Sequence, residues 1–127
     1  MSVKHIQPAA LHETPGYTHV VVAAGLAYVS GQVALDRERR LVGSGDVEAQ
    51  AAQVFANLDA ALAEVGAGLG DVLRLNTYVT DAGHVAGFRR VRDRVLPTPQ
   101  PASTLVVVEA LADPEWLIEI EAVAAVP

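Results

Sequence analysis

Cysteine is absent from this sequence of 127 residues, and its absence excludes three kinds of chemistry. Without a thiol the chain forms no disulfide bond, no thiolate metal site and no cysteine nucleophile. Aromatic residues are scarce, at 5%, so a core has to be built mainly from alanine, valine and leucine. Hydrophobic residues make up 51% of the chain, which is enough for such a core without disulfides or a structural metal.

Long apolar runs are also missing. No stretch approaches the roughly 18 residues that cross a bilayer, and the N-terminus lacks the basic region and apolar run of a signal peptide. We therefore expect a cytoplasmic protein without a membrane partner. The formal net charge of −6 repels phosphate backbones, so the sequence argues against nucleic acid as a partner.

Motifs for metal or nucleotide chemistry are lacking too. The four histidines do not have the His-x-x-x-His spacing of a metal site, and neither a Gly-x-Gly-x-x-Gly nor a P-loop pattern occurs. No nucleophile-elbow pattern places Ser30 or Ser103 in a Ser-His-Asp hydrolase. We therefore expect no metal and no cofactor.

The chain does contain a regular succession of strand and helix patterns. No linker, repeat or low-complexity tract divides it, so we expect one domain over residues 1–127. Apolar patterns predict five strands, at residues 19–23, 26–33, 72–80, 104–110 and 116–125. Helical spacing predicts two helices, at residues 47–65 and 82–96. The charged segment 36–40 is expected to be a solvated loop.

Capping residues support both helices. Asp46 is suited to cap the start of the first helix, and Gly66 stands where a glycine commonly ends one. Asp81 is expected to cap the second helix, and Pro97 closes it. The resulting order, β-β-α-β-α-β-β, is that of an α+β protein.

This order predicts an uncovered sheet face. Right-handed crossovers place both helices on one face of a mixed sheet. Segments 20–22 and 105–108 are apolar on both of their faces, and two short helices cannot cover that much surface. We expect other copies of the chain to bury the uncovered face, although the pattern alone does not fix their number.

Six segments carry a resemblance to a known family. Over nearly its whole length the chain resembles the RidA or YjgF-type family, and the Ser-Gly-Gln and Ile-Glu-Ile-Glu segments are the most specific parts. The matching segments are Pro15 to Tyr17, Ala27 to Gln32, Gln50 to Asn57, Asn76 to Asp81, Pro101 to Thr104 and Ile118 to Ala122.

The resemblance implies a fold, an assembly and an activity. The fold is the chorismate-mutase-like α+β fold, a mixed sheet with two helices on one face. The assembly is a homotrimer in which strands line a central barrel. Family members with known activity hydrolyse imines or enamines derived from amino acids, and they release a 2-keto acid and ammonia from a small-molecule pocket between subunits.

Roles for single residues follow from the resemblance, position by position. Glu119 corresponds to the catalytic glutamate that places the attacking water, and Glu121 is the fallback because the preceding loop has one extra residue. Tyr17 corresponds to a tyrosine that lines the pocket. Ser103 stands where the family has the arginine that binds the substrate carboxylate, and the backbone at Gly31 is expected to offer a polar contact.

The serine at position 103 leaves three functions open. A hydroxyl supplies one neutral donor, whereas a guanidinium binds a carboxylate bidentately, and the difference is worth about 2–4 kcal/mol of binding. Arg89, near a family pocket position, is a candidate replacement. The chain is then a hydrolase of imines, enamines or related carbonyl-type compounds, or a non-catalytic metabolite-binding module. Older family labels add a translation inhibitor or endoribonuclease, which the acidic charge disfavours.

Overall fold

The computed structural model describes residues 2–127, which form a six-stranded sheet and two α-helices. The strands are β1 (Val3–Ile6), β2 (Val20–Ala23), β3 (Leu26–Gln32), β4 (Val72–Val79), β5 (Ala102–Val107) and β6 (Ile118–Ala125). The helices are α1 (Val47–Ala63) and α2 (Val85–Val95), with short 3₁₀ turns at Leu69–Asp71 and Ala82–His84.

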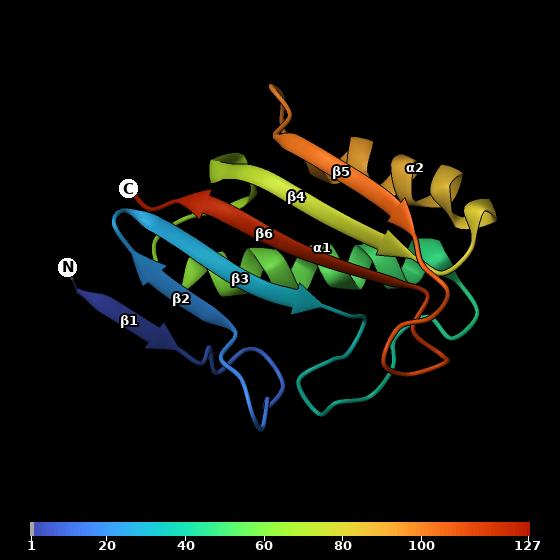
Figure 1. Cartoon of the computed structure of the whole chain (residues 1–127), viewed down its shortest axis with the longest axis horizontal. Helices are drawn as coiled ribbons and strands as arrows, with labels where there is room; N and C mark the ends of the chain where they lie inside the picture. The colour runs from blue at the N-terminus through green and yellow to red at the C-terminus, as the bar shows by residue number, and fades with distance from the viewer. Residues whose placement is uncertain (1) are drawn as a thin grey trace.

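The sheet is mixed, and both helices cover the same face of it (Figure 1). Its strand order is β1-β2-β3-β6-β4-β5, in which β4 and β5 run parallel and every other pair is antiparallel. The prediction of an α+β fold with two helices on one face is confirmed. The structure adds the edge strand β1, which the sequence reading missed.

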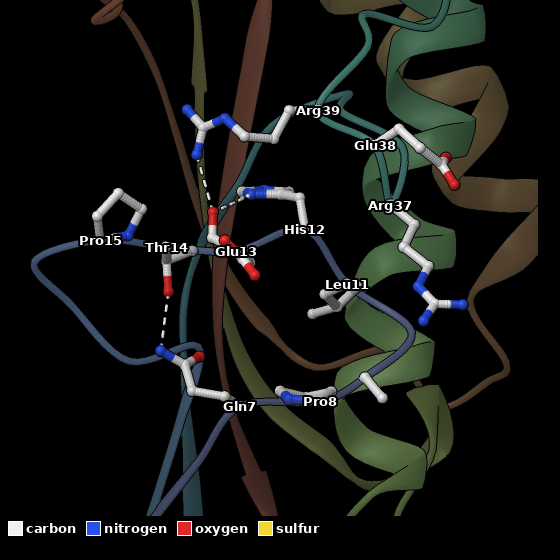
Figure 2. A pocket seen from close by; sticks show the side chains of 11 residues that line it. Gln7, Pro8, Leu11, His12, Glu13, Thr14, Pro15, Arg37, Glu38 and Arg39 are labelled. Carbon is white, nitrogen blue, oxygen red and sulfur yellow. Dashed lines mark hydrogen bonds between the residues drawn. The ribbon is translucent and has the colours of Figure 1, made fainter.

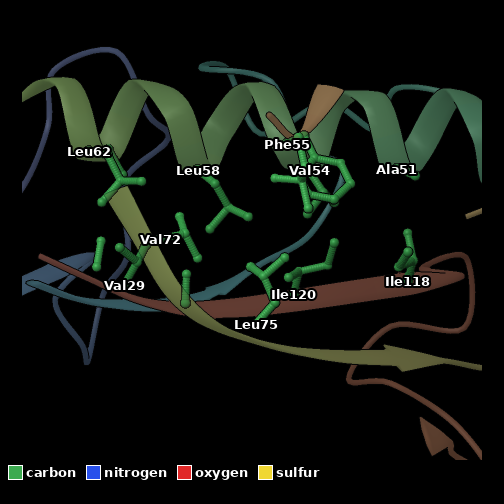
Figure 3. Close-up of a cluster of buried hydrophobic side chains, with 14 of the residues drawn as sticks. Val29, Ala51, Val54, Phe55, Leu58, Leu62, Val72, Leu75, Ile118 and Ile120 are labelled. Atoms are coloured by element: carbon green, nitrogen blue, oxygen red, sulfur yellow. The ribbon is translucent and has the colours of Figure 1, made fainter. Parts of the chain in front are cut away.

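The core lies between α1 and the sheet (Figure 3). From α1, Val54, Phe55 and Leu58 are almost fully buried, and they meet Leu75 of β4 and Ile120 of β6. Burial of such side chains is worth about 1.5–3 kcal/mol each. In residues 2–127 no helix combines the length and the apolar character that a membrane crossing requires.

The helix ends follow the predicted caps at α1 and differ at α2. Asp46 accepts hydrogen bonds from the backbone amides of the first turn of α1, at 3.1 Å each. Gly66 has φ of 75°, a left-handed conformation that glycine adopts freely, and it terminates the helix region as predicted. Asp81 caps the 3₁₀ turn instead of α2 itself, because its side chain accepts from the Gly83 amide at 2.7 Å.

The face of the sheet opposite the helices is uncovered in a single chain, as the sequence predicted. Tyr28 of β3 and Val106 of β5 point to this side and are 49% and 41% exposed. Hydrogen-bonded polar side chains lie among the apolar ones; for example, Arg74 donates to Thr104 at 2.6 Å. We call this surface, formed by alternate residues of β3, β6, β4 and β5, the bare sheet face.

Two buried side-chain amides of α1 hold the loop that follows β3 and the loop that precedes β6. The Gln50 side chain donates to the Glu115 carbonyl at 3.0 Å and accepts from the Leu117 amide at 2.9 Å, directly before β6. The Asn57 side chain donates to two carbonyls just after β3, those of Val33 and Leu35, at 3.1 and 3.0 Å. These buried groups fix the two chain segments that converge on the site.

Candidate functional site

A cavity of about 430 Å³ opens where β3 ends and β6 begins. Three of the residues singled out in the sequence line it together: Tyr17, Gly31 and Glu119. The pairing of β3 with β6 brings them together, because Gln32 lies opposite Ile120 in the register. Residues about 100 positions apart in the sequence thereby become neighbours in one cavity.

The Glu119 side chain lies directly against the backbone of Gly31. A Cβ atom added at Gly31 would overlap the Oε2 atom of Glu119 and would lie 2.9 Å from its Cδ atom. Gly31 also falls where the β3–β6 register shifts, and glycine is common in such irregular strand ends. Because glycine has no side chain, the carboxyl group of Glu119 can lie against the backbone at position 31.

The environment of Glu119 makes its carboxyl group a weaker acid than an ordinary glutamate. Burial raises the pKa of Glu119 above that of an ordinary glutamate, and the negative charge of Glu121 raises it further. Glu121 itself is occupied outside the cavity, because the Tyr78 hydroxyl donates to its carboxylate on the bare sheet face. Of the two glutamates weighed in the sequence, Glu119 is the one that lines the cavity.

Tyr17 stands at the opening of the cavity, on a loop held by side-chain hydrogen bonds. Its backbone carbonyl accepts from Gln7 at 2.9 Å and from Thr14 at 2.8 Å. Partial burial raises the pKa of the Tyr17 hydroxyl, and a nearby arginine, Arg39, lowers it in part. The side chain is half exposed, so a ligand in the cavity can reach it.

Among the polar and aromatic residues that line the cavity, three were not singled out in the sequence: His12, Arg39 and Trp116. His12 is buried beside His19, at 5.0 Å between ring centroids. With Gln32 donating to its Nδ1 at 3.0 Å, His19 carries its proton on Nε2, which donates to the His12 carbonyl at 2.8 Å. Burial lowers the pKa of His19 and so favours this neutral form.

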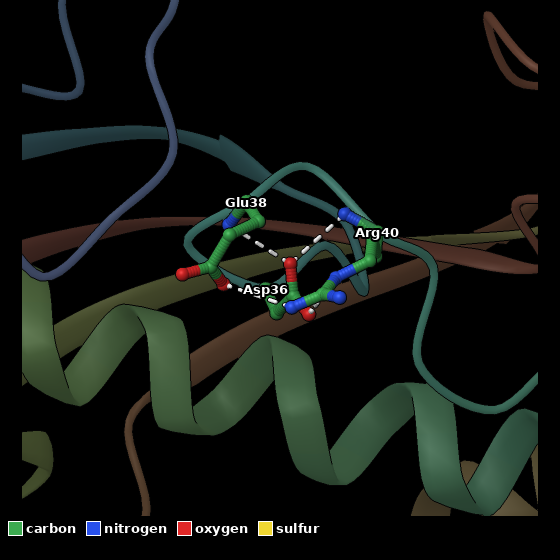
Figure 4. A network of polar contacts seen from close by, with 3 residues as sticks. All are labelled: Asp36, Glu38 and Arg40. Carbon is green, nitrogen blue, oxygen red and sulfur yellow. Dashed lines mark hydrogen bonds and ion pairs between the residues drawn. The ribbon is translucent and has the colours of Figure 1, made fainter.

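Arg39 belongs to the charged segment 36–40, which was interpreted as a solvated loop. The interpretation suits Arg40, which is exposed and forms ion pairs with Asp36 and Glu38 at 3.4 and 3.5 Å (Figure 4). Arg39 is exposed as well, in agreement with the interpretation, but it also lines the cavity together with Tyr17. The sequence shows the charge of Arg39, but the direction of its side chain depends on the backbone conformation of the turn.

Ser103 and Arg89 lie outside this cavity in the single chain. Ser103, near the start of β5, lines a separate cavity of about 330 Å³ together with Arg92 and Gln100. Arg89 is exposed on α2 and touches neither cavity. Within residues 2–127 of one chain, the predicted site residues therefore lie in three places: the cavity of Glu119, the cavity of Ser103, and the exposed surface of α2.

Comparison with known proteins places the chain among its relatives. Residues 7–126 match the family described as Endoribonuclease L-PSP. A RutC family protein from Synechocystis sp. is 33% identical over 130 residues, which cover 100% of this chain and 99% of the relative. The match thus extends over all the residues that line the cavity.

Two solved structures show the same arrangement of strands and helices. RidA from an Antarctic Psychrobacter has a TM-score of 0.86 and 31% identity, covering 95% of this chain and 97% of that one. Yeast Mmf1 has a TM-score of 0.91 and 26% identity, covering 99% and 100%. Fold and cavity define a small α+β protein of the chorismate-mutase-like class. The chain belongs to the RidA/YjgF-type family, whose model carries the description endoribonuclease L-PSP.

Proposed function

We propose that this protein hydrolyses the imine or enamine form of a small metabolite to a carbonyl compound and ammonia. The observation that carries the proposal is the half-buried carboxyl group of Glu119, seated against Gly31 in a cavity that Tyr17 also lines. An imine carbon is already electrophilic, so the protein needs only to place a water molecule and to move protons. One carboxylate in a small, partly dry cavity is suited to both tasks.

The reaction balances with Glu119 as the only proton carrier. The oxygen of water bonds to the imine carbon, while one water proton passes through Glu119 to the nitrogen and gives an amino alcohol. The hydroxyl proton of this intermediate then passes through Glu119 to the same nitrogen. The C–N bond breaks, a C=O group and NH₃ leave, and Glu119 is again a carboxylate.

The assembly we propose is a homotrimer in which the bare sheet faces meet. Tyr28 and Val106 are large apolar side chains that are 49% and 41% exposed in the single chain, and contact between copies would bury them. Ser103, on the edge strand β5, would then contribute to the cavity of a neighbouring copy, whereas Arg89, exposed on α2 at the opposite side of the sheet, would stay outside this interface. Sedimentation equilibrium is expected to give three times the mass of the chain, and a monomer would refute the shared site.

A hydrolysis assay tests the function. Freshly generated 2-imino acids with different side chains are offered to the wild type and to Ser103→Arg, and their decay is followed against buffer alone. We expect the wild type to accelerate the formation of 2-keto acid and ammonia. If only Ser103→Arg accelerates it, the natural ligand is not a 2-imino acid, because turnover then requires an arginine that the chain lacks.

A non-catalytic binding module is the second candidate, and the serine at position 103 is the observation that favours it. Such a module would be stabilised by its ligand without forming a product. The endoribonuclease role named in the family description has less support, because the net charge of −6 opposes the binding of RNA. Cleavage of RNA that disappears with a change of purification would identify a contaminant.

A further inference from the structure

We propose that Arg39 binds the carboxylate of the substrate, in the role that the serine at position 103 cannot fill. This inference rests on the proposed function and specifies the substrate as an anionic 2-imino acid. It assigns the anion-binding group to the cavity of Glu119 itself. No arginine from the β5 region is then needed to hold the substrate.

The position of Arg39 is the first argument. Its side chain lines the same 430 Å³ cavity as Glu119 and Tyr17, so a ligand that reaches the carboxyl group also lies beside the guanidinium. In Figure 2, Arg39 and Arg37 extend in different directions from the loop, and Arg39 reaches toward the segment around Glu13. Figure 2 shows a second, adjoining cavity of about 720 Å³, which both arginines line, whereas Arg37 does not line the cavity of Glu119.

The free hydrogen-bonding capacity of Arg39 is the second argument. A guanidinium has five N–H donors, and the Nη1 atom of Arg39 donates to the Glu13 carbonyl at 2.8 Å. This single bond anchors the side chain to a neutral acceptor and leaves its charge uncompensated. Among residues 2–127 no carboxylate forms an ion pair with Arg39, whereas its neighbour Arg40 pairs with two.

The loop holds Arg39 in a fixed direction. The Asp36 carboxylate accepts from the amides of Glu38 and Arg40, at 2.9 Å each, and so closes the turn around position 39 (Figure 4). Arg39 itself has φ of 62°, a left-handed conformation that a long side chain seldom adopts. The turn thereby directs the exposed side chain of Arg39 away from those of Arg37 and Glu38 (Figure 2).

The charge balance of the site supplies the third argument. The chain carries a formal charge of −6, and Glu119 and Glu121 are close enough to affect each other electrostatically. An anionic substrate is repelled from such a place unless a cation faces it. The charge of Arg39 reaches the cavity that Tyr17 lines, because it offsets part of the rise that burial causes in the pKa of Tyr17. A carboxylate is the ligand group that a guanidinium fits best, because two of its N–H groups can donate to the two carboxylate oxygens.

The experiment compares Arg39→Gln with Arg37→Gln, a matched change two residues away in the same loop. Pyruvate, the product expected from 2-iminopropanoate, is titrated into each variant and into the wild type by calorimetry. We expect Arg39→Gln to raise the Kd for pyruvate about 10- to 100-fold, whereas Arg37→Gln keeps the wild-type value. Hydrolysis of 2-iminopropanoate should show the same increase in KM with little change in kcat.

The outcomes separate this inference from the proposed function. Unchanged Kd and KM in Arg39→Gln would overturn the inference, while turnover by the wild type would still support the function. Weakened pyruvate binding in Arg39→Gln without imine hydrolysis by any variant would support the anion site and refute the catalysis. A neutral control, the amide of the same imino acid, should be hydrolysed equally by the wild type and by Arg39→Gln, and a parallel loss there would contradict a carboxylate contact.

Discussion

Glu119→Gln is expected to lower the kcat for imine hydrolysis by about 10²- to 10⁴-fold. Glutamine keeps the size of the side chain and its seat against Gly31, but it cannot take a proton from water or return one to the nitrogen. The measurement is steady-state formation of ammonia and 2-keto acid. Binding of pyruvate should change little, because the proposed anion contact does not involve Glu119.

The matched control is Glu121→Gln, two residues along the same strand. Glu121 accepts a hydrogen bond from Tyr78 on the bare sheet face and does not line the cavity. We expect Glu121→Gln to keep kcat within a factor of about 10, because only its charge affects Glu119 from a distance. Equal losses in the two variants would show that the reaction does not depend on Glu119.

The raised pKa of Glu119 allows a second measurement on Glu119→Gln, that of its thermal stability as a function of pH. The pKa of Glu119 is higher in the folded chain than in the unfolded one. The stability linked to Glu119 is therefore fully present below its unfolded-state pKa, and it is lost as pH rises through its folded-state pKa. Glutamine does not ionise, so we expect the Tm of Glu119→Gln to equal or exceed that of the wild type at neutral pH. The difference should vanish near about pH 4. A lower Tm at neutral pH would indicate a structural role.

The same raised pKa sets the pH dependence of the wild type. The reaction begins with Glu119 as a carboxylate, so kcat should fall as pH decreases through its pKa. Because burial raises that pKa, the acid limb should lie above the value near 4.3 that is usual for glutamate. Glu119→Gln should abolish this limb.

Gly31→Ala is expected to reduce turnover about 100-fold or more while the fold remains intact. The new Cβ atom would overlap the Glu119 carboxyl group and would displace it from its seat. A shift of about 1 Å in a catalytic group is enough for a loss of this size. The displaced atoms are the end of a flexible side chain, so we expect a cost in stability of less than about 2 kcal/mol.

Gly70→Ala is the control for adding a methyl group to a glycine. At position 70 the added Cβ atom would meet only Pro97, at an ordinary contact distance of 3.5 Å. Circular dichroism and thermal unfolding should therefore be close to wild type for Gly70→Ala, and turnover should be unchanged. If Gly31→Ala also kept full turnover, the close approach of Glu119 to the backbone would have no part in catalysis.

The sequence was most informative where apolar spacing and capping agree. The helix α1 was predicted to start at residue 47 and does so, because Asp46 caps a continuous apolar stripe. The strand β1 was missed, since its four residues are mostly exposed and polar residues stand at its centre. Such a strand forms because it can pair with the edge strand β2. That edge exists only once the sheet has formed, so local sequence does not reveal it.

The site was predictable only in part, for a related reason. Resemblance indicated Glu119, Tyr17 and Gly31, and the pairing of β3 with β6 accounts for their meeting. Arg39 was read as one charge in a charged run, because periodicity says nothing about a left-handed residue in a turn. The distance of Ser103 from the cavity likewise depends on which strand β5 joins.

The place of β6 in the sheet bears on how the protein is made. β6 follows the other five strands in the sequence, yet it lies between β3 and β4. Among the strands of residues 2–127, it alone joins the two halves of the sheet. A nascent chain that has not yet exposed residues 118–125 to its partners therefore holds two separate groups of strands, each with an open edge. Glu119, the proposed catalytic group, lies on that joining strand, so the proposed site is completed only when β6 has joined the two groups of strands.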